Sequence, residues 1–455
     1  MQRGALSWRT GFIALALLAW VSGCAADHNP VGLEYGSGTV VVVPSPDSLQ
    51  STWVLIGPDS YSRDGVGVQA LLGRLPGRYT ITWGDSNGSA DTSGETKILS
   101  PVGAITFTQT LKERDPVARR FDVKDFGAAG DGITDDYQAI QAAIDACAGG
   151  GLGELSLPAG SYLIGEVLSL KGGVRLIGYG ANLVTVANTT HIDIPPGASD
   201  VKISGIQFKT RNSKRGTDGR AAVRINSAEM TPAPFDIEVS DCTFTDLAHC
   251  AVSGALCTDV WVINNLIRNV GEHGVYAAAG ADRWMISGNI IEGADVTRDH
   301  HAGIKITGMG VTVSNNTISD VVGTSSSFGI VVEYSNGPVS IIGNQISGCR
   351  EGARIGYTSN VSIYANLFRD NLLDGYYGDV TFRSAPGDGN GLSNITISSN
   401  SFFGSSGNKQ ASVFYHVDSE TAESVLISGN TVGGAYIDFF GGSNAGFEIV
   451  DNDAH

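Results

Sequence analysis

A repeat that runs through the C-terminal half of the chain restricts the possible folds most strongly. Each unit has a β-branched residue followed two or three positions later by a small polar residue, most often asparagine. The recurring asparagines are spaced by 24, 27, 28, 22, 34 and 30 residues and are Asn265, Asn289, Asn316, Asn344, Asn366, Asn400 and Asn430. A near-constant unit with insertions of variable length is typical of a solenoid in which each repeat forms one coil.

The residue types within the repeat favour strands over helices. Short β-branched runs occupy each unit, and asparagine suits a turn with left-handed backbone whose side-chain amides can bond from coil to coil. We therefore predict an all-β fold, a right-handed parallel β-helix (solenoid) of roughly ten coils, over residues 116–455. The helical pattern at 136–147 is predicted to cap its N-terminal end. Asp135 and Gln138 resemble a capping box at the start of that helix.

The residues before the repeats have a different organisation. Between residues 38 and 115, short apolar runs alternate with turn clusters, which predicts a small β-sandwich acting as a spacer. Trp53 and Trp83 could bind sugar there, although their positions inside strand patterns favour a place in the core. Residues 24–37 are predicted to form a tether.

The first residues read as an export signal. Arg3 and Arg9 precede an apolar run that ends in Val21-Ser-Gly-Cys24, which resembles the lipobox of bacterial lipoproteins. We expect a signal peptide over residues 1–23 and a lipid on Cys24, which anchors the exported protein to the bacterial envelope (the outer membrane or cell surface in a Gram-negative host). An ordinary secretory signal that happens to end in cysteine is the alternative.

Charge and cysteine content exclude several classes of protein. The chain has 46 acidic and 29 basic residues, a net charge of −17, which argues against a nucleic-acid partner. The five cysteines after Cys24 fit no zinc spacing, and either a disulfide among Cys242, Cys250 and Cys257 or buried free thiols fit the pattern. No metal site is predicted; Ca²⁺ is a possible cofactor for which no carboxylate cluster can be placed. The oligomeric state is left open.

Three segments together resemble a known family. Residues 121–144, 157–164 and 174–180 are similar to the opening of the rhamnogalacturonase/epimerase-like pectate lyase domain. The resemblance implies a pectin-lyase-like β-helix that acts on, or grips, carbohydrate. It leaves the reaction open, because the family holds lyases, hydrolases, epimerases and phage depolymerases. Only fragments of the polygalacturonase motifs occur, at 272–274 and 354–356, and the Asp-Pro-His of alginate epimerases is absent.

A second repeated pattern, of glycines, identifies the strand face that could carry catalytic residues. Glycines recur before strands at Gly274, Gly303, Gly329, Gly352 and Gly375, with apolar residues mostly one and three positions later. Alternation turns those residues inward and turns the second and fourth positions outward. The outward second positions are Tyr276, Lys305, Val331, Arg354 and Tyr377, and the fourth positions include Glu333 and Asp379. The turns before the strands add His273, His301, Glu351 and Asp374.

The outward residues of successive coils form columns that could bind a polysaccharide along the stack. A merely hydrophilic strand face is the alternative. Coils stack about 4.8 Å apart, which puts Lys305 and Arg354 about 10 Å from each other. Aromatic rings stack on sugars, and cations pair with uronate carboxylates. We expect Tyr377, His301, Glu351 and Asp374 to bind substrate. Arg215, in the basic stretch from Lys209 to Arg224, is a further candidate, although a solvated loop also explains that stretch.

Two reaction types fit the column, and a non-catalytic role is the third possibility. In β-elimination, Lys305 is the base, Tyr276 or His273 is the acid, and Arg354 neutralises the uronate carboxylate. A hydrolase would use Glu333 and Asp379, two coils apart on one face, near the inverting separation of roughly 6.5–9.5 Å. We favour a lyase acting on a uronate-containing polysaccharide. The alternatives are a glycoside hydrolase, an epimerase, and a surface protein that binds glycan without changing it.

Overall fold

The structure is a computed structural model. It describes residues 38–45, 52–66, 69–83, 95–99, 104–110, 119–211, 221–225, 232–294, 301–323, 326–335, 337–371, 379–383, 392–403, 412–417, 422–433, 436–440 and 446–454. The chain divides into two compact units, Met1–Val117 and Ala118–His455. The expected signal peptide, Cys24 and the tether lie outside the described residues. No helix in the described part of the chain is long and apolar enough to cross a membrane.

The first unit consists of two small sheets. A three-stranded sheet has the order β4 (Gln69–Arg74), β1 (Gly38–Ser45), β7 (Ala104–Thr110). An antiparallel four-stranded sheet has the order β3 (Ser62–Val66), β2 (Thr52–Ile56), β5 (Gly77–Trp83), β6 (Glu95–Leu99). The side chains of Trp53, Tyr79 and Phe107 are buried in its core. Trp53 is thus a packing residue and is not available to a sugar.

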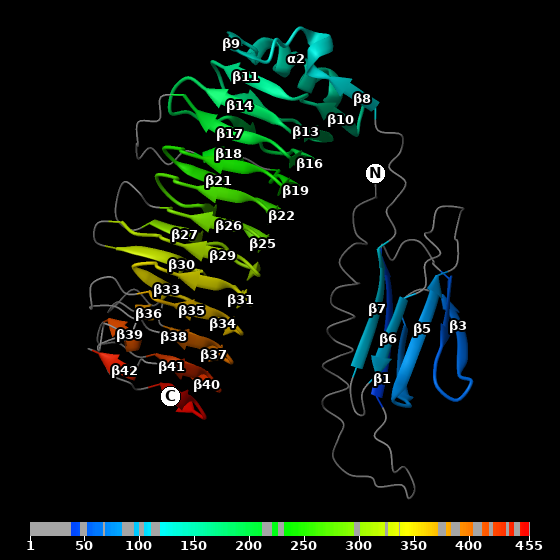
Figure 1. Cartoon of the computed structure of the whole chain (residues 1–455), viewed down its shortest axis with the longest axis vertical. Coiled ribbons are helices and arrows are strands. Elements are labelled where there is room, and N and C mark those ends of the chain that lie inside the picture. The colour runs from blue at the N-terminus through cyan, green and yellow to red at the C-terminus, as the bar shows by residue number, and fades with distance from the viewer. Residues whose placement is uncertain are drawn as a thin grey trace, which may run out of the picture. The chain divides into compact units, whose positions relative to one another are not determined.

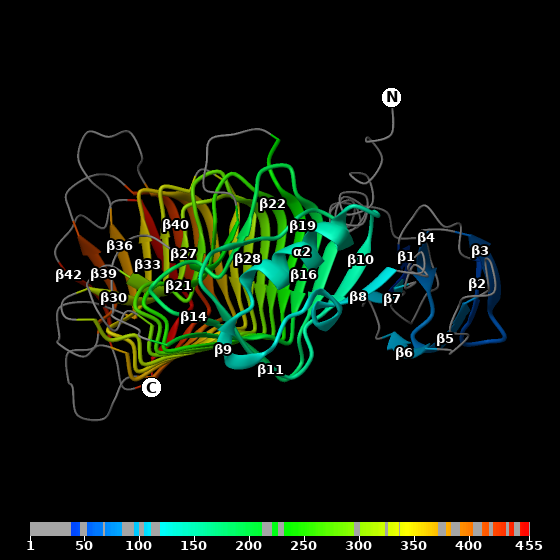
Figure 2. The ribbon, with the colours of Figure 1, turned by 90° about the horizontal axis from the view of Figure 1, so that it is seen from above.

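The second unit is a parallel β-helix with three long sheets (Figures 1 and 2), as the repeat predicted. Each coil contributes one strand to each of the first two sheets, which have 13 strands apiece, and all but the first and last coils contribute one of the 11 described strands of the third sheet. Successive coils pair in parallel. The first sheet contains β8 (Arg119–Asp122), β10 (Gly153–Ser156), β13 (Val174–Ile177), β16 (Ser199–Ser204), β19 (Phe235–Ser240), β22 (Thr258–Ile263), β25 (Asp282–Ser287), β28 (Val311–Ser314), β31 (Val339–Ile342), β34 (Ser359–Tyr364), β37 (Ser393–Ser398), β40 (Glu423–Ser428) and β43 (Phe447–Val450).

The other two sheets complete each coil. The second contains β9 (Asp131–Asp135), β11 (Gly160–Ile164), β14 (Ala181–Thr185), β17 (Gln207–Thr210), β20 (Thr243–Thr245), β23 (Leu266–Arg268), β26 (Ile290–Glu292), β29 (Thr317–Ser319), β32 (Gln345–Ser347), β35 (Leu367–Arg369), β38 (Ser401–Phe403), β41 (Thr431–Gly433) and β44 (Asp453–Ala454). The third contains β12 (Leu168–Ser169), β15 (Ile192–Ile194), β18 (Ala221–Ile225), β21 (Cys250–Gly254), β24 (Val275–Ala277), β27 (His301–Ile306), β30 (Ser327–Glu333), β33 (Glu351–Gly356), β36 (Val380–Arg383), β39 (Ser412–Val417) and β42 (Tyr436–Phe440).

The recurring asparagines form a continuous hydrogen-bonded ladder. In each step, one asparagine donates its backbone N–H and its Nδ2–H to the Oδ1 of the next, as Asn316 does to Asn344 at 2.9 Å and 2.9 Å. The same geometry connects every neighbour from Asn265 to Asn452. The left-handed backbone falls one residue earlier than expected, for example on Asn315 (φ 55°) and Ala365 (φ 54°). The ladder asparagine itself is therefore selected for its bonds.

The glycines that recur before the strands of the third sheet are required by sterics. We call Gly274, Gly303, Gly329 and Gly352 the glycine column. A Cβ on Gly303 would lie 2.8 Å from the carbonyl oxygen of Gly329, and a Cβ on Gly329 would lie 2.6 Å from that of Gly352. A Cβ on Gly352 would in turn lie 2.5 Å from the carbonyl oxygen of Asp379. Only glycine allows successive coils to approach this closely before the strands of the third sheet.

The helix α2 (Tyr137–Ala148) lies at the end of the stack near β8 and β9 (Figure 1). It follows the short 3₁₀ helix η1 (Val123–Phe126) and packs against β8, β10 and β12. Four of its apolar residues are buried: Ile140, Ala143, Ile144 and Cys147.

The expected capping box does not form at the start of this helix. The carboxylate of Asp135 instead accepts hydrogen bonds from the N–H groups of Tyr137 and Gly165. The neighbouring Asp136 carboxylate accepts the N–H groups of Ala129 and Gly130. These aspartates bind backbone, which accounts for them without a metal ion.

Candidate functional site

The outer face of the third sheet carries the residues that the sequence singled out. Tyr276 pairs with Lys305, Lys305 with Val331, and Val331 with Arg354 in neighbouring coils. The expected register is therefore confirmed for these four residues. Arg354 next pairs with Thr381, where the sequence predicted Tyr377. We call the five residues Tyr276, Lys305, Val331, Arg354 and Thr381 the outer column.

The expected position of Asp379 is wrong, and the glycine column explains why. Its backbone carbonyl accepts the N–H of Ala353 at 2.7 Å, so Asp379 occupies the place in its coil that Gly352 occupies in the preceding one. The place next to Glu333 and Gly356 belongs to Arg383. Alignment on Gly375 had shifted the whole strand by four residues.

Asp379 is a buried acid and does not belong to the outer face. Its side chain is 1% exposed, and its Oδ1 accepts a hydrogen bond of 2.9 Å from Asn371 Nδ2. Burial raises the pKa of Asp379 to about 7, although the bond from Asn371 opposes this. Glu333 and Asp379 consequently do not form the pair of carboxylates that a hydrolase would need on one face.

Two histidines, a tyrosine and a lysine form a cluster at β24 and β27. The ring of His273 lies 5.1 Å from that of Tyr276 and 4.8 Å from that of His301, and Lys305 Nζ lies 5.5 Å from the centre of the Tyr276 ring. The Nδ1 atom of His273 accepts the N–H of Ala302 at 3.0 Å, which places the ring proton on Nε2. We call His273, Tyr276, His301 and Lys305 the His–Tyr–Lys cluster.

His273 stays neutral in this cluster. It is 6% exposed, and burial, with the neighbouring His301 and the cation of Lys305, lowers the pKa of His273 well below its usual range. A buried neutral ring with an occupied Nδ1 is suited to holding its neighbours in place. Tyr276, His301 and Lys305 are only half-buried, so they remain accessible to a ligand.

Arg354 is held rigidly at the next part of the column. It is 3% exposed, its guanidinium carbon lies 3.9 Å from the centre of the Phe328 ring, and its Nη2 donates to Glu351 Oε1 at 2.8 Å. Glu351 is completely buried, which raises its pKa to about 7, while Arg354 opposes that shift. Glu351, expected to bind substrate, therefore serves to position Arg354.

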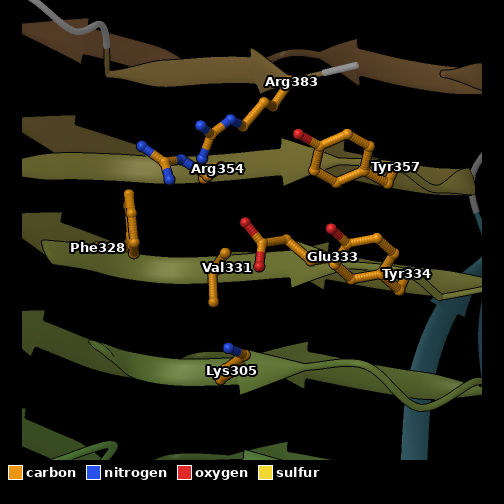
Figure 3. Close-up of a pocket in the computed structure, with 8 residues that line it drawn as sticks. All are labelled: Lys305, Phe328, Val331, Glu333, Tyr334, Arg354, Tyr357 and Arg383. Carbon is orange, nitrogen blue, oxygen red and sulfur yellow. The ribbon is translucent and has the colours of Figure 1, made fainter. Parts of the chain in front are cut away.

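A pocket of about 340 Å³ opens on the outer face beside Arg354 (Figure 3). Its walls come from four consecutive coils: Lys305, Phe328, Val331, Glu333, Tyr334, Arg354, Tyr357 and Arg383. The rings of Tyr334 and Tyr357 are stacked with centres 4.8 Å apart and an angle of 10° between their planes. Sequence reasoning missed Tyr334, Tyr357 and Arg383. Each tyrosine follows a column glycine by five residues, and this repetition could have revealed them.

The remaining candidates fall outside this face or outside the described residues. Tyr377, Asp374 and Arg215 belong to segments that the structure does not describe. From the basic stretch, Arg224 pairs with Asp193 at 2.7 Å. All five cysteines of the described residues are buried free thiols. Within the described residues, no group of three or more His, Cys, Asp or Glu side chains could hold a metal ion.

Two family models match the sequence of the chain. The family model described as rhamnogalacturonase A/epimerase, pectate lyase-like matches residues 120–354, and a right-handed β-helix model matches residues 257–455. The solved A-module of mannuronan C-5 epimerase AlgE6 from Azotobacter vinelandii superposes with a TM-score of 0.57 at 17% identity. That superposition covers 74% of this chain and 99% of the module, and at this identity it supports the fold alone.

Two curated relatives from the same organism match parts of the sequence. Mannuronan C5-epimerase AlgE3 is 45% identical over 93 residues, which is 19% of this chain and 5% of the relative. Alginate lyase 7 is 30% identical over 198 residues, which is 34% of this chain and 23% of the relative. The chain therefore spans less than a quarter of either relative.

Proposed function

Because the chain belongs to the rhamnogalacturonase A/epimerase, pectate lyase-like family, we propose that it is a carbohydrate-active enzyme whose substrate is a uronate-containing polysaccharide. We further propose that it removes the C5 proton of a uronate bound over the His–Tyr–Lys cluster. The observation that carries this proposal is the placement of Lys305 beside Tyr276 and the two histidines on an open strand face. A cation beside proton carriers is what abstraction next to a carboxylate requires.

The roles of the cluster residues differ from the initial hypothesis. The ammonium of Lys305 meets the uronate carboxylate, because it is the cation of the cluster and lies 5.5 Å from the centre of the Tyr276 ring. Tyr276 and His301, whose rings both lie next to that of His273, carry the proton to and from the sugar. His273 positions both rings, because its own ring is buried and its Nδ1 is occupied.

Two outcomes follow from one intermediate. Removal of the C5 proton leaves an electron pair that spreads into the carboxylate, where Lys305 neutralises the charge. In elimination, the pair forms a C4–C5 double bond and expels the C4 oxygen, which takes a proton from the second carrier. In epimerisation, the second carrier returns a proton to C5 from the opposite face. We favour elimination, and the similarity to mannuronan C5-epimerases supports epimerisation as the second candidate.

Hydrolysis is the weaker reading of this site. Glu333 lines the pocket, but the acid expected to act with it, Asp379, is buried and held by Asn371. Glu351 is also fully buried, and one of its carboxylate oxygens is bound to Arg354. Neither acid offers an accessible oxygen to a glycosidic bond opposite Glu333.

We also propose that the enzyme works at the bacterial envelope, attached through a lipid on Cys24. The arrangement of Val21-Ser-Gly-Cys24 behind a charged start and an apolar run supports this proposal. The unit over residues 38–115 would then separate the β-helix from the membrane.

A substrate panel tests the proposed reaction. A soluble form beginning at Ala25 is incubated with polygalacturonate, rhamnogalacturonan, alginate and glycosaminoglycans. Ultraviolet absorbance of unsaturated uronate, reducing ends and proton NMR of the sugar configuration are followed together. Unsaturation rising with reducing ends indicates elimination, and a changed C5 configuration without cleavage indicates epimerisation. Reducing ends alone, or an unchanged polymer that stays bound, would contradict the proposal.

Matched variants locate the chemistry. Lys305→Met, Tyr276→Phe and His301→Asn should each lower kcat by at least about a hundredfold, the usual size of a lost acid–base or electrostatic contribution. Lys202→Met is the control, because Lys202 is a partly exposed lysine on the first sheet that pairs with Glu238 at 2.9 Å. Equal activity in the Lys305 and Lys202 variants would remove the site from the outer column.

A further inference from the structure

The pocket beside the His–Tyr–Lys cluster contains an excess of positive charge. Three cations line it, Lys305, Arg354 and Arg383, against one carboxylate, that of Glu333. In Figure 3 the guanidinium of Arg383 extends toward that of Arg354 from the neighbouring coil. This concentration of cations stands out on a chain whose net charge is −17.

Arg354 and Arg383 each have a buried N–H donor, at Nε, without a hydrogen-bond partner among the described residues. The buried acid Glu351 accepts from Arg354 Nη2 at 2.8 Å, and its charge also acts on Arg383, but Arg383 forms no ion pair within the described part of the chain. Neighbouring guanidinium groups repel each other, so the arrangement is stabilised when an anion lies between them.

We propose that this pocket is a subsite for the carboxylate of a second, non-reacting uronate, which Arg383 and Arg354 bind together. This assignment rests on the proposed function for the identity of the reacting sugar. Lys305 and Arg354 are separated by two steps of the coil, about 10 Å at the usual strand spacing. A polysaccharide laid along the stack presents another sugar at about that distance, so Lys305 and the arginines can each meet the carboxylate of a different sugar.

The stacked tyrosines form the side wall of this subsite. Tyr334 is 52% exposed, and in Figure 3 the hydroxyl groups of Tyr334 and Tyr357 point to the same side. Both residues have left-handed backbone, with φ of 55° and 50°. A bulky residue in that conformation is strained, and such strain is concentrated at ligand sites. The wall is suited to supporting a sugar ring whose carboxylate faces the arginines.

The subsite predicts which polymers are good substrates. A chain with free carboxylates on both the reacting and the second sugar satisfies Lys305 and the arginines together. A neutral or methyl-esterified sugar in the second position leaves both guanidinium groups without their anion. The enzyme should therefore discriminate by a carboxylate remote from the bond that changes.

Equilibrium binding tests the subsite independently of turnover. Oligogalacturonate, oligomannuronate and methyl-esterified oligogalacturonate are titrated calorimetrically into the full chain that carries Tyr276→Phe, which slows turnover by at least about a hundredfold. At least one free-acid oligomer should bind about tenfold or more tighter than the ester, as expected for a charge-assisted bidentate contact. Adding Arg383→Met should abolish that difference, and Arg383→Lys should reduce it. Arg268→Met is the control, because Arg268 is exposed and pairs with Glu292 on the second sheet.

The possible results separate the two proposals. Equal binding of acid and ester, unchanged affinity in the Arg383→Met protein, or no binding of either free-acid oligomer would overturn the subsite. Acid-selective binding that depends on Arg383, combined with no chemistry on any polyuronate, would instead overturn the proposed function alone.

Discussion

Removing one side chain from the asparagine ladder should destabilise the β-helix far more than a substitution on a strand face. Asn344 is 1% exposed, and its Oδ1 accepts from the backbone N–H and the Nδ2 of Asn316, each at 2.9 Å. Its Nδ2 donates to Val313 O at 3.0 Å and to Asn366 Oδ1 at 2.9 Å. The change Asn344→Ala breaks all of these bonds and leaves their partners in a region closed to water.

The size of the effect follows from those bonds. Each buried hydrogen bond contributes about 1 kcal/mol net, and an orphaned partner costs about 1–3 kcal/mol. Four broken bonds therefore lower the free energy of unfolding by about 4 kcal/mol. Asn452→Ala, at the end of the ladder and partly exposed, should cost clearly less, because water can replace its bonds.

Urea unfolding followed by circular dichroism measures this difference, and hydrogen exchange at the Asn316 amide localises it. The control is Ser340→Ala, a half-buried serine on β31 outside the ladder. An Asn344→Ala midpoint equal to that of the control, or an unchanged exchange rate at Asn316, would refute the reasoning that the ladder stabilises the stack.

Three further predictions concern packing, pH and attachment. Gly329→Ala should destabilise the stack, because its Cβ would lie 2.6 Å from the carbonyl oxygen of Gly352; a thermal midpoint equal to wild type would contradict this. Burial raises the pKa of Asp379 from 3.8 to about 7, so the stability that its protonated form contributes should be lost progressively as pH rises from 3.8 to about 7. Asp379→Asn, which can still accept from Asn371, should flatten that fall in a pH series of unfolding midpoints. Cys24→Ser should prevent palmitate labelling and membrane retention in a bacterial host; persistent labelling would disprove attachment at this residue.

The β-helix architecture could be predicted because the sequence repeat has one unit for each coil. Asn265 and its successors mark one corner of every coil, and Gly274, Gly303, Gly329 and Gly352 mark another. Both marks reflect contacts between neighbouring coils, which impose the same residue type at each step. The outer column from Tyr276 to Arg354 follows from these marks by strand alternation alone.

The site was only partly predictable, because the recurring glycines stop at Gly352. The next coil has Asp379 at the glycine position, so alignment on Gly375 placed Asp379 outside and missed Arg383. Burial of Glu351 was also invisible in the sequence, since its place depends on how Arg354 packs on Phe328. The left-handed residue before each ladder asparagine varies in type, including Ala365 and Ser399, and so carries no sequence signal.

The most direct test of the central claim is the isotope effect of deuterium at C5 of the uronate. The polyuronate that reacts in the substrate panel is prepared with deuterium at C5, and its rate is compared with that of the unlabelled polymer. We predict a primary isotope effect on kcat/KM, whether the product is unsaturated or epimerised, because both outcomes break the C5–H bond over Tyr276, His301 and Lys305. Equal rates for the two polymers, together with release of saturated reducing ends, would contradict it and indicate hydrolysis.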